Sequence, residues 1–433
     1  MRALIVSYYF PPAGGGGVQR VLKWAQYLPQ HGVDVDVLAP DTSGWLQEDA
    51  SLEIPDSVTV HRARNRSPKT RRPAEELAGL SGPRRMLHRA ALQPRRLLYP
   101  DIHAGWTIAA APRGIQVVAE RGIDVVISTS PPKTCHVIAR RIARATGVPW
   151  IADFRDSWLD LPHLRLDNRA VQVRQAVNIR YATRLLSHAA AITTVSEPLA
   201  RDLRRRHPEV PVHVITNGVD FAQLTSLPAT EPLLRDAQRA DRWVISYTGN
   251  FFGRQSPTTF LQALRDVIEA EPDRAASIVV RCVGGLRAAD QELIASSPAL
   301  REIVECVEFL PHDSVLAEQR AADMLFLYVA PGRGSEGIYT GKAFEYVASG
   351  RPILALAPSN NVAAQLVRDA NAGIVVDPED VASIANALRT EHDRWKAHGR
   401  APTRELDAEV RAAISREHQA LHLAELVQQV ATR

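Results

Sequence analysis

Short apolar runs alternate with amphipathic stretches along the first half of the chain. Short apolar runs are typical of buried strands, and apolar residues spaced three and four apart are typical of helices. The strands are predicted at residues 3–7, 33–38, 58–63, 124–128, 149–153, 191–195 and 213–215. The helices are predicted at residues 18–31, 134–146 and 174–188. Such an alternation predicts a parallel sheet with helices on both faces.

The pattern pauses over residues 217–241, a polar and turn-rich stretch predicted to link two domains, and then restarts. The later strands are predicted at residues 243–248, 277–283, 307–309, 324–329, 352–357 and 373–376. The later helices are predicted at residues 258–270, 314–321, 342–349, 363–370 and 381–391.

The expected fold class is α/β, with two doubly wound Rossmann-like domains at residues 1–222 and 223–407. The tail 408–433 has helical periodicity and is predicted to pack back on the first domain. Ligands of such sheets bind at the carboxyl ends of the strands. We therefore expect a site in the cleft across which the two domains face each other.

Composition limits the class of protein. The chain has 433 residues, 45% hydrophobic and 23% charged, as expected for a globular protein of two or three domains. Its three cysteines show neither metal-ligand spacing nor a disulfide framework, which favours a reducing compartment. No apolar run is long enough to span a membrane, and the N-terminal run is too short for a signal peptide. We expect a cytoplasmic protein.

Positive charge is concentrated in one segment, although the whole chain has a net charge of only +4. Residues 61–100 contain eleven Lys or Arg against two acidic residues, Glu75 and Glu76. Such a cluster suits anionic lipid headgroups, at about 1 kcal/mol per charge, so peripheral contact with the inner face of the cell membrane is expected. Nucleic acid is not expected as a partner, because the segment has few aromatic residues and no matching motif. The alternative is a solvated loop.

The stretch 335–357 carries the most informative pattern: a tight loop, a short helix and a buried strand. A loop that leads into a helix N-terminus offers unpaired N–H groups and a positive dipole end, which suit a phosphate. Lys342 adds a positive charge there, and Glu345 lies three residues on, on the same helix face. A cation for phosphate beside a carboxylate for sugar hydroxyls fits a nucleotide. The alternative is an ordinary surface ion pair.

A glycine loop follows the first predicted strand. Gly14, Gly15, Gly16 and Gly17 allow a ligand to approach the backbone closely. Their spacing matches neither the dinucleotide-binding nor the Walker A pattern. The loop is therefore a candidate for contact with a substrate, and a flexible turn is the alternative.

Further candidates follow other predicted strands. Asp153, Arg155 and Asp156 lie where an open sheet places its active site. Arg155 could clamp a carboxylate or a phosphate, or the charges could form an internal network that braces the loop. His136 is also near a strand end, but a lone histidine is more often structural. The Asp-x-Asp pair at residues 34–36 could hold Mg²⁺, yet it lies inside an alternating strand pattern, and we interpret it as polar strand positions.

Several motifs now join the glycine loop: those at residues 153–158, 194–197, 215–220, 247–250 and 341–346. Together they resemble the retaining, nucleotide-sugar-dependent glycosyltransferases of the GT-B fold in family four, also called group 1 glycosyltransferases. The resemblance covers nearly the whole chain. It implies that the second domain binds the nucleotide diphosphate.

The resemblance also implies roles for single residues. Glu345 would receive the ribose hydroxyls, and Tyr339, Thr340, Gly341 and Lys342 would contact the phosphate and the donor sugar. Arg254 would bind the diphosphate, and Gly249 and Asn250 would lie in the donor site. The loop Gly14 to Gly17 would lie against the donor phosphates and the acceptor.

Two positions depart from the family pattern. The family commonly has one residue fewer between its two motif glutamates than the eight that separate Glu336 and Glu345 here. Gly337 occupies the expected first position, so Glu336 remains in the donor-site set without the usual role on the donor sugar. Many members have a histidine on the donor sugar where Arg155 stands, and an arginine would suit an acidic sugar or a phosphate. The Phe-Arg-Asp variant resembles members that build bacterial surface polysaccharides and natural-product glycosides.

The resemblance implies transfer of a hexose-type sugar from a nucleoside diphosphate, with UDP expected, to a hydroxyl of a lipid-linked or small-molecule acceptor, with retention. Lys342, Arg254 and Arg155 are the expected catalytic residues. Lys342, Arg254 and the helix N-terminus would stabilise the leaving group electrostatically. No metal and no cofactor are implied. An NDP-sugar epimerase of the same fold and a non-catalytic scaffold are the alternatives.

Overall fold

The computed structural model describes residues 1–41, 48, 49, 51–67, 82–84, 86, 98–157, 169–226, 241–251, 255–307 and 310–432. The chain divides into two compact units, one of residues 1–216 with 416–433 and one of residues 217–415. The chain leaves the first unit at residue 216, where the sequence predicted 222, and returns to it at 416, where the sequence predicted 408.

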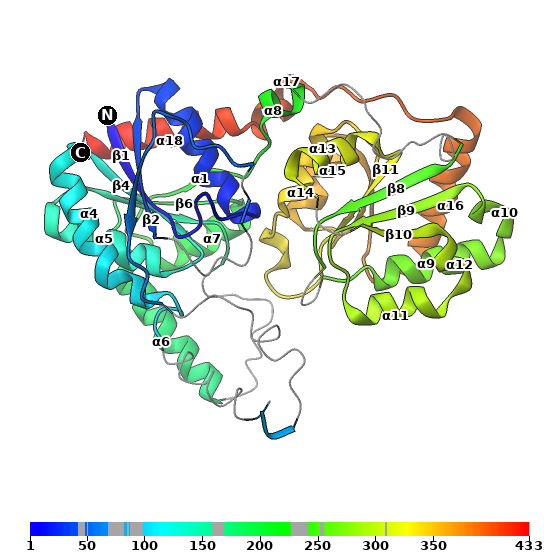
Figure 1. Ribbon diagram of the computed structural model, residues 1–433, viewed down its shortest axis with the longest axis horizontal. Coiled ribbons are helices and arrows are strands. Elements are labelled where there is room, and N and C mark those ends of the chain that lie inside the picture. Colours follow the sequence, from blue (N-terminus) through cyan, green and yellow to red (C-terminus); the bar gives the residue numbers. More distant parts are fainter. Residues whose placement is uncertain are drawn as a thin grey trace. The chain divides into compact units, whose positions relative to one another are not determined.

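The first unit is built on a seven-stranded sheet in the order β3-β2-β1-β4-β5-β6-β7 (Figure 1). Neighbouring strands run parallel, and Ile5 of β1 lies between Val37 and Ile127. The order reverses between β1 and β4, so the carboxyl ends of these two strands form the topological switch point where such sheets bind ligands. The strands are β1 (Arg2–Val6), β2 (Asp34–Pro40), β3 (Thr59–Ala63), β4 (Val125–Ser130), β5 (Trp150–Phe154), β6 (Ala191–Thr194) and β7 (Val212–Val214).

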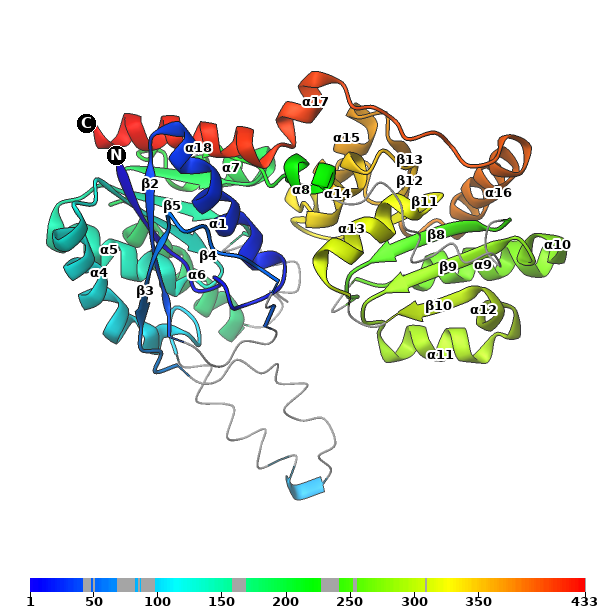
Figure 2. The same ribbon diagram turned by 45° about the horizontal axis from the view of Figure 1, so that its top comes forward.

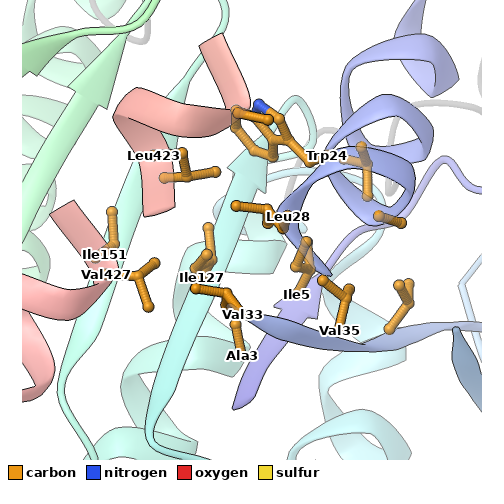
Figure 3. Close-up of a cluster of buried hydrophobic side chains, with 14 of the residues drawn as sticks. Ala3, Ile5, Trp24, Leu28, Val33, Val35, Ile127, Ile151, Leu423 and Val427 are labelled. Atoms are coloured by element: carbon orange, nitrogen blue, oxygen red, sulfur yellow. The ribbon is translucent and has the colours of Figure 1, made fainter. Parts of the chain in front are cut away.

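Helices cover both faces of this sheet. Helices α1 and α18 pack on one face, where Trp24 and Leu28 meet Leu423 and Val427 (Figure 3). The C-terminal helix thus belongs to the core of the first unit. Helices α4, α5 and α6 cover the other face. The bounds are α1 (Gly16–Tyr27), η1 (Leu28–His31), η3 (Ala104–Trp106), α4 (Thr107–Arg121), α5 (Thr134–Thr146), α6 (Arg169–Leu186), α7 (Glu197–Arg206) and α18 (Arg416–Ala431).

The second unit repeats this design with a six-stranded parallel sheet in the order β10-β9-β8-β11-β12-β13 (Figure 2). Its switch point lies between β8 and β11. The strands are β8 (Trp243–Thr248), β9 (Ile278–Val283), β10 (Val304–Val307), β11 (Met324–Tyr328), β12 (Ile353–Leu356) and β13 (Gly373–Val376).

Two helical layers also enclose the second sheet. Helices α9 and α16 pack on one face around Phe260 and Leu388, and helices α13, α14 and α15 pack on the other around Phe344 and Val367. The bounds are α8 (Phe221–Ser226), α9 (Thr258–Ala270), α10 (Pro272–Ala275), α11 (Ala288–Ser296), α12 (Pro298–Ile303), α13 (His312–Ala321), η4 (Ser335–Gly337), α14 (Gly341–Ala348), α15 (Val362–Asp369), α16 (Val381–His398) and α17 (Ala408–Ala413).

The predicted α/β class with two doubly wound sheets is confirmed. The strand predicted at residues 307–309 is misplaced, because β10 begins at Val304, and residues 308–309 lie outside the described part. The predicted linker contains helix α8 in its described portion. Within the described chain, no helix is both long and apolar enough to cross a membrane.

Candidate functional site

The carboxyl end of β8 is covered by the side chain of Lys342. Gly249 follows this strand with φ +121°, a conformation that residues with a side chain rarely adopt. A Cβ at Gly249 would lie 2.7 Å from Cε and 2.8 Å from Nζ of Lys342. The lysine can therefore lie across the strand end, at the switch point of the second sheet, because residue 249 has no side chain.

Lys342 is an ammonium group without a counter-ion bonded to it. Its Nζ lies 4.8 Å from the centre of the Tyr247 ring, and it makes no hydrogen bond or ion pair with the part of the chain that the structure describes. Burial lowers the pKa of Lys342 to about 8, while the charge of Glu345 acts in the opposite direction. An anion at this place would stabilise the ammonium form.

Glu345 lies one turn further along α14, and side chains of α13 hold its carboxylate. Gln319 donates from Nε2 to Oε2 of Glu345 at 2.9 Å and is also 3.0 Å from Oγ1 of Thr248. His312 Nε2 lies 3.2 Å from Oε1 of Glu345. The other ring nitrogen of His312, Nδ1, lies 3.4 Å from Nε2 of Gln223. The Glu345 side chain is 22% exposed, so its carboxylate is oriented and still accessible.

Helix α14 is attached directly to the strand end. The Thr248 N–H donates to the hydroxyl of Tyr346 at 2.9 Å. Burial raises the pKa of Tyr346, so its hydroxyl stays neutral. The helix that carries Lys342 and Glu345 is thus fixed to β8 at the switch point.

The loop before α14 is held by a residue from a distant segment. Asn361 donates from Nδ2 to the carbonyls of Ser335 at 2.5 Å and Ile338 at 3.1 Å. Its Oδ1 accepts from the N–H of Ala363 at 2.8 Å and caps α15. This buried side chain therefore fixes the loop whose residues the sequence assigned to phosphate and sugar.

The other predicted donor-site residues surround this loop. Tyr339 packs on Phe344 at 4.8 Å between ring centres, and burial raises its pKa to about 12. Thr340 is the N-cap residue of α14, and its Oγ1 has no hydrogen-bond partner in the described structure. Gly341, the first residue of α14, is exposed.

Two more predicted donor residues lie on separate loops. Asn250 accepts from the N–H of Gly285 at 2.6 Å and joins the loops that follow β8 and β9. Glu336 lies in η4, half-buried, without a hydrogen bond or ion pair to the described residues. Arg254 lies outside the described residues. No group of three or more His, Cys, Asp or Glu that could hold a metal ion occurs in the described parts of the chain.

In the first unit, Arg155 connects the two loops of the switch point. It donates to the carbonyl of Gly17 in the glycine loop, to that of Ser130 at 3.1 Å and to that of Pro131 at 2.7 Å. Gly15 caps α1 with φ +90°, and a Cβ at Gly14 would lie 2.9 Å from the Cβ of Asp49. Gly16 has open space where its Cβ would be. The Arg155 guanidinium thus supports the glycine loop from the end of β5.

Asp153 takes part in an internal charge network, the alternative weighed from the sequence, but its partner is Arg20, which the sequence did not indicate. Its carboxylate lies 2.8 Å and 3.1 Å from two nitrogens of Arg20, and it also accepts from the hydroxyls of Thr129 at 2.7 Å and Thr193 at 2.8 Å. Arg20 and Asp153 are both buried. These contacts anchor α1 to the centre of the sheet.

The remaining candidates of the first unit differ in exposure. His136 is buried with Nδ1 2.7 Å from the hydroxyl of Ser128, and burial lowers its pKa to about 3. Asp156 is exposed and lines a small cavity between α6 and α7. Asp36 of the Asp-x-Asp pair is buried in β2 beside His61 at 2.7 Å, as the strand interpretation expected.

Sequence reasoning missed Gln319, His312, Asn361 and Arg20. One signal for the first two was available. They are seven residues apart, which puts both on one face of a single helix. Nothing in the sequence indicates that this helix face contacts Glu345, or that Arg20 pairs with Asp153.

The chain matches two family models. The glycosyl transferase 4-like domain matches residues 15–218, and the glycosyl transferases group 1 domain matches residues 242–392. A comparison with curated proteins finds no match.

Solved structures with the same fold span the whole chain. Sucrose-phosphate synthase from Thermosynechococcus elongatus has a TM-score of 0.66 at 17% identity, over 99% of this chain and 98% of that one. A UDP-forming alpha,alpha-trehalose-phosphate synthase from Burkholderia xenovorans, solved with glucose-6-phosphate, has a TM-score of 0.65 at 15% identity, over 99% of each chain. Anabaena HepE, solved with UDP, has a TM-score of 0.58 at 16% identity, over 100% of this chain and 98% of that one.

The two doubly wound sheets define a GT-B glycosyltransferase architecture. The protein belongs to the group 1 glycosyltransferases.

Proposed function

We propose that the protein transfers a sugar from a nucleoside diphosphate sugar, with UDP as the nucleotide, to an acceptor hydroxyl with retention. One observation carries the proposal: the Lys342 ammonium and the Glu345 carboxylate project from adjacent turns of a helix fixed to the end of β8. The solved relatives support UDP, since HepE binds it and the trehalose-phosphate synthase releases it.

In this proposal each end of the nucleotide meets a complementary charge. The ribose hydroxyls donate to Glu345, whose carboxylate Gln319 and His312 already orient. The diphosphate lies against Lys342 and the N-terminus of α14, where backbone N–H groups and the helix dipole favour an anion. Arg254 supplies a second cation, and the Thr340 hydroxyl is available to donate.

The same charges would stabilise the leaving group. The bond from the sugar C1 to the diphosphate breaks while a bond from C1 to the acceptor oxygen forms on the same face. The acceptor proton passes to the departing diphosphate oxygen, so no protein base is needed. Lys342 contributes because it is in place before charge develops on that oxygen. Arg155 acts through the glycine loop, which it supports.

The basic composition of residues 61–100 leads us to propose a lipid-linked acceptor at the inner face of the cell membrane. The protein would then act in the cytoplasm as a peripheral enzyme of surface-polysaccharide synthesis. A soluble small-molecule acceptor is the alternative.

Nucleotide binding to a Glu345→Ala variant tests the donor site. A thermal-shift panel of UDP, GDP, TDP and ADP identifies the base, because a ligand at 100 times its Kd stabilises the protein by roughly 2.7 kcal/mol. Loss of a charge-assisted hydrogen bond costs about 1.5–3 kcal/mol. The variant should therefore bind the preferred nucleotide about ten- to hundredfold more weakly.

Glu302→Ala is the matched control, since Glu302 is an exposed carboxylate on α12 in the same unit. Unchanged binding of every nucleotide by Glu345→Ala would contradict the proposal. Conversion of the donor without an acceptor would indicate an epimerase, and NMR of the product's anomeric proton would show whether configuration is retained.

A further inference from the structure

Five arginines on helices α5 and α6 lack a counter-ion in the described structure. Arg140, Arg141 and Arg144 lie on α5, and Arg180 and Arg184 lie on α6. None of them makes an ion pair with the described residues. Several other arginines of this unit are paired with carboxylates, among them Arg2 with Asp34, Arg20 with Asp153, Arg113 with Glu120 and Arg121 with Asp36.

These positive charges are close to one another. Helices α5 and α6 pack against each other on the same face of the first sheet (Figure 1). Burial and the neighbouring charges of Arg144 and Arg184 lower the pKa of Arg140. Arg141, Arg144, Arg180 and Arg184 are all exposed. No carboxylate of the described residues therefore offsets the repulsion between these arginines, and an anionic surface would offset it.

Exposed aliphatic side chains continue this surface along α6. Val173 is 65% exposed and Val177 is 53% exposed. The positions 173, 177, 180 and 184 follow a spacing of four, three and four, so they form one stripe along the helix. The helix contains no acidic residue between its ends at 169 and 186. A helix with arginines and aliphatic residues on its open face is typical of one that lies on a membrane surface.

The basic segment predicted from the sequence ends beside this surface. Tyr99, near the end of residues 61–100, packs edge-on against Tyr181 of α6, with ring centres 4.6 Å apart and planes at 86°. Tyr99 is also 36% exposed. Tyrosine is favoured at the membrane–water interface because its ring is apolar and its hydroxyl is polar.

We propose that the α5–α6 surface, made of Arg141, Arg144, Val173, Val177, Arg180 and Arg184, docks the protein on an anionic lipid membrane. The arginines bind lipid headgroups, and the valines enter the boundary between headgroups and acyl chains. A nucleic acid fits less well, because the exposed apolar residues of the stripe are valines, and Tyr99 beside it is a single ring already packed edge-on against Tyr181.

Co-sedimentation with vesicles of phosphatidylcholine, with and without phosphatidylglycerol, tests this docking. The full-length protein should bind only the anionic vesicles, and the binding should weaken as salt is added. Each charge near the surface contributes about a fivefold factor in partitioning. Arg180→Gln combined with Arg184→Gln should therefore weaken binding about thirtyfold. Val173→Ser with Val177→Ser should weaken binding to the same vesicles without a change in net charge.

The matched control is Arg301→Gln with Lys396→Gln, which removes two exposed charges from the second unit. An equal loss of binding in this control would overturn the proposal, because net charge alone would then explain the effect. Lack of binding by the unmodified protein would overturn it as well. The proposal would also be overturned if the Arg180→Gln/Arg184→Gln variant still bound the vesicles but no longer bound a short RNA. UDP binding should be unchanged in every variant, so the result is independent of the proposed donor site.

Discussion

Removal of either partner of the Arg20–Asp153 ion pair should strongly destabilise the first unit. The two side chains are 1% and 0% exposed, and their closest charged atoms are 2.8 Å apart. Arg20 also donates to the carbonyls of Ile215 and Thr216, both at 2.8 Å. The guanidinium and the carboxylate are therefore both buried and neutralise each other. Replacement of one side chain would leave the charge of its partner buried without a counter-ion.

The magnitude follows from this burial. Breaking one side of a buried ion pair costs about 3–5 kcal/mol, whereas removing both charges costs much less. We expect Asp153→Asn and Arg20→Met each to lower the free energy of unfolding by about 3–5 kcal/mol. Arg20→Met also loses the stacking of its guanidinium on Trp24, 4.3 Å from the ring centre. The double variant should cost at least about 2 kcal/mol less than the sum of the single variants.

Urea denaturation followed by tryptophan fluorescence measures these differences. Asp56→Asn is the matched control, since Asp56 is an exposed carboxylate of the same unit, and it should change the midpoint little. Single variants that cost less than about 1 kcal/mol, or strictly additive costs, would refute the reasoning. Lost transfer activity in Asp153→Asn at unchanged stability would instead indicate a catalytic aspartate.

Two further predictions concern the donor site. Gly249→Ala should lower stability by about 1–3 kcal/mol, because φ is +121° there and the new methyl group displaces the end of Lys342. Gly341→Ala should keep full stability, since nothing lies within 4 Å of its added Cβ. Equal melting temperatures of Gly249→Ala and Gly341→Ala would contradict this account. UDP affinity should fall as the pH rises above about 8, where Lys342 loses its proton, by up to about tenfold per pH unit. Lys342→Arg should abolish that dependence, because a guanidinium stays charged. Calorimetric titration measures the UDP affinity at each pH, and an affinity of the native protein that does not change with pH would rule the mechanism out.

The sequence predicted the fold well where local pattern decides structure. Helices α5 and α9 and strands β8 and β13 lie at their predicted residues, since each has a clear apolar period and a sharp end. Helix α4 was not predicted, and it contains Pro112, a residue that usually ends a helix. Strand β10 was misplaced by three residues at its start, because the edge of this sheet is only partly buried and its pattern is weak.

Site residues were predictable where the chemistry lies within one short motif. Lys342 and Glu345 are three residues apart, so their shared helix face follows from the spacing alone. The groups that position them come from elsewhere: Gln319 is 26 residues from Glu345, and Asp153 is 133 residues from Arg20. Such partners depend on which strands become neighbours, and strand order is a property of the folded sheet.

The cations at the two switch points differ in how far the protein itself engages them. At the first, the Arg155 guanidinium is engaged by three backbone carbonyls, so its hydrogen-bonding capacity is largely used inside the unit. At the second, the Lys342 ammonium has no hydrogen bond or ion pair among the described residues, and the Glu345 carboxylate is held yet accessible. A half-buried cation without an internal partner is costly unless an anion binds there. This difference supports the proposal that a diphosphate binds at the second sheet and that the acceptor contacts the glycine loop of the first.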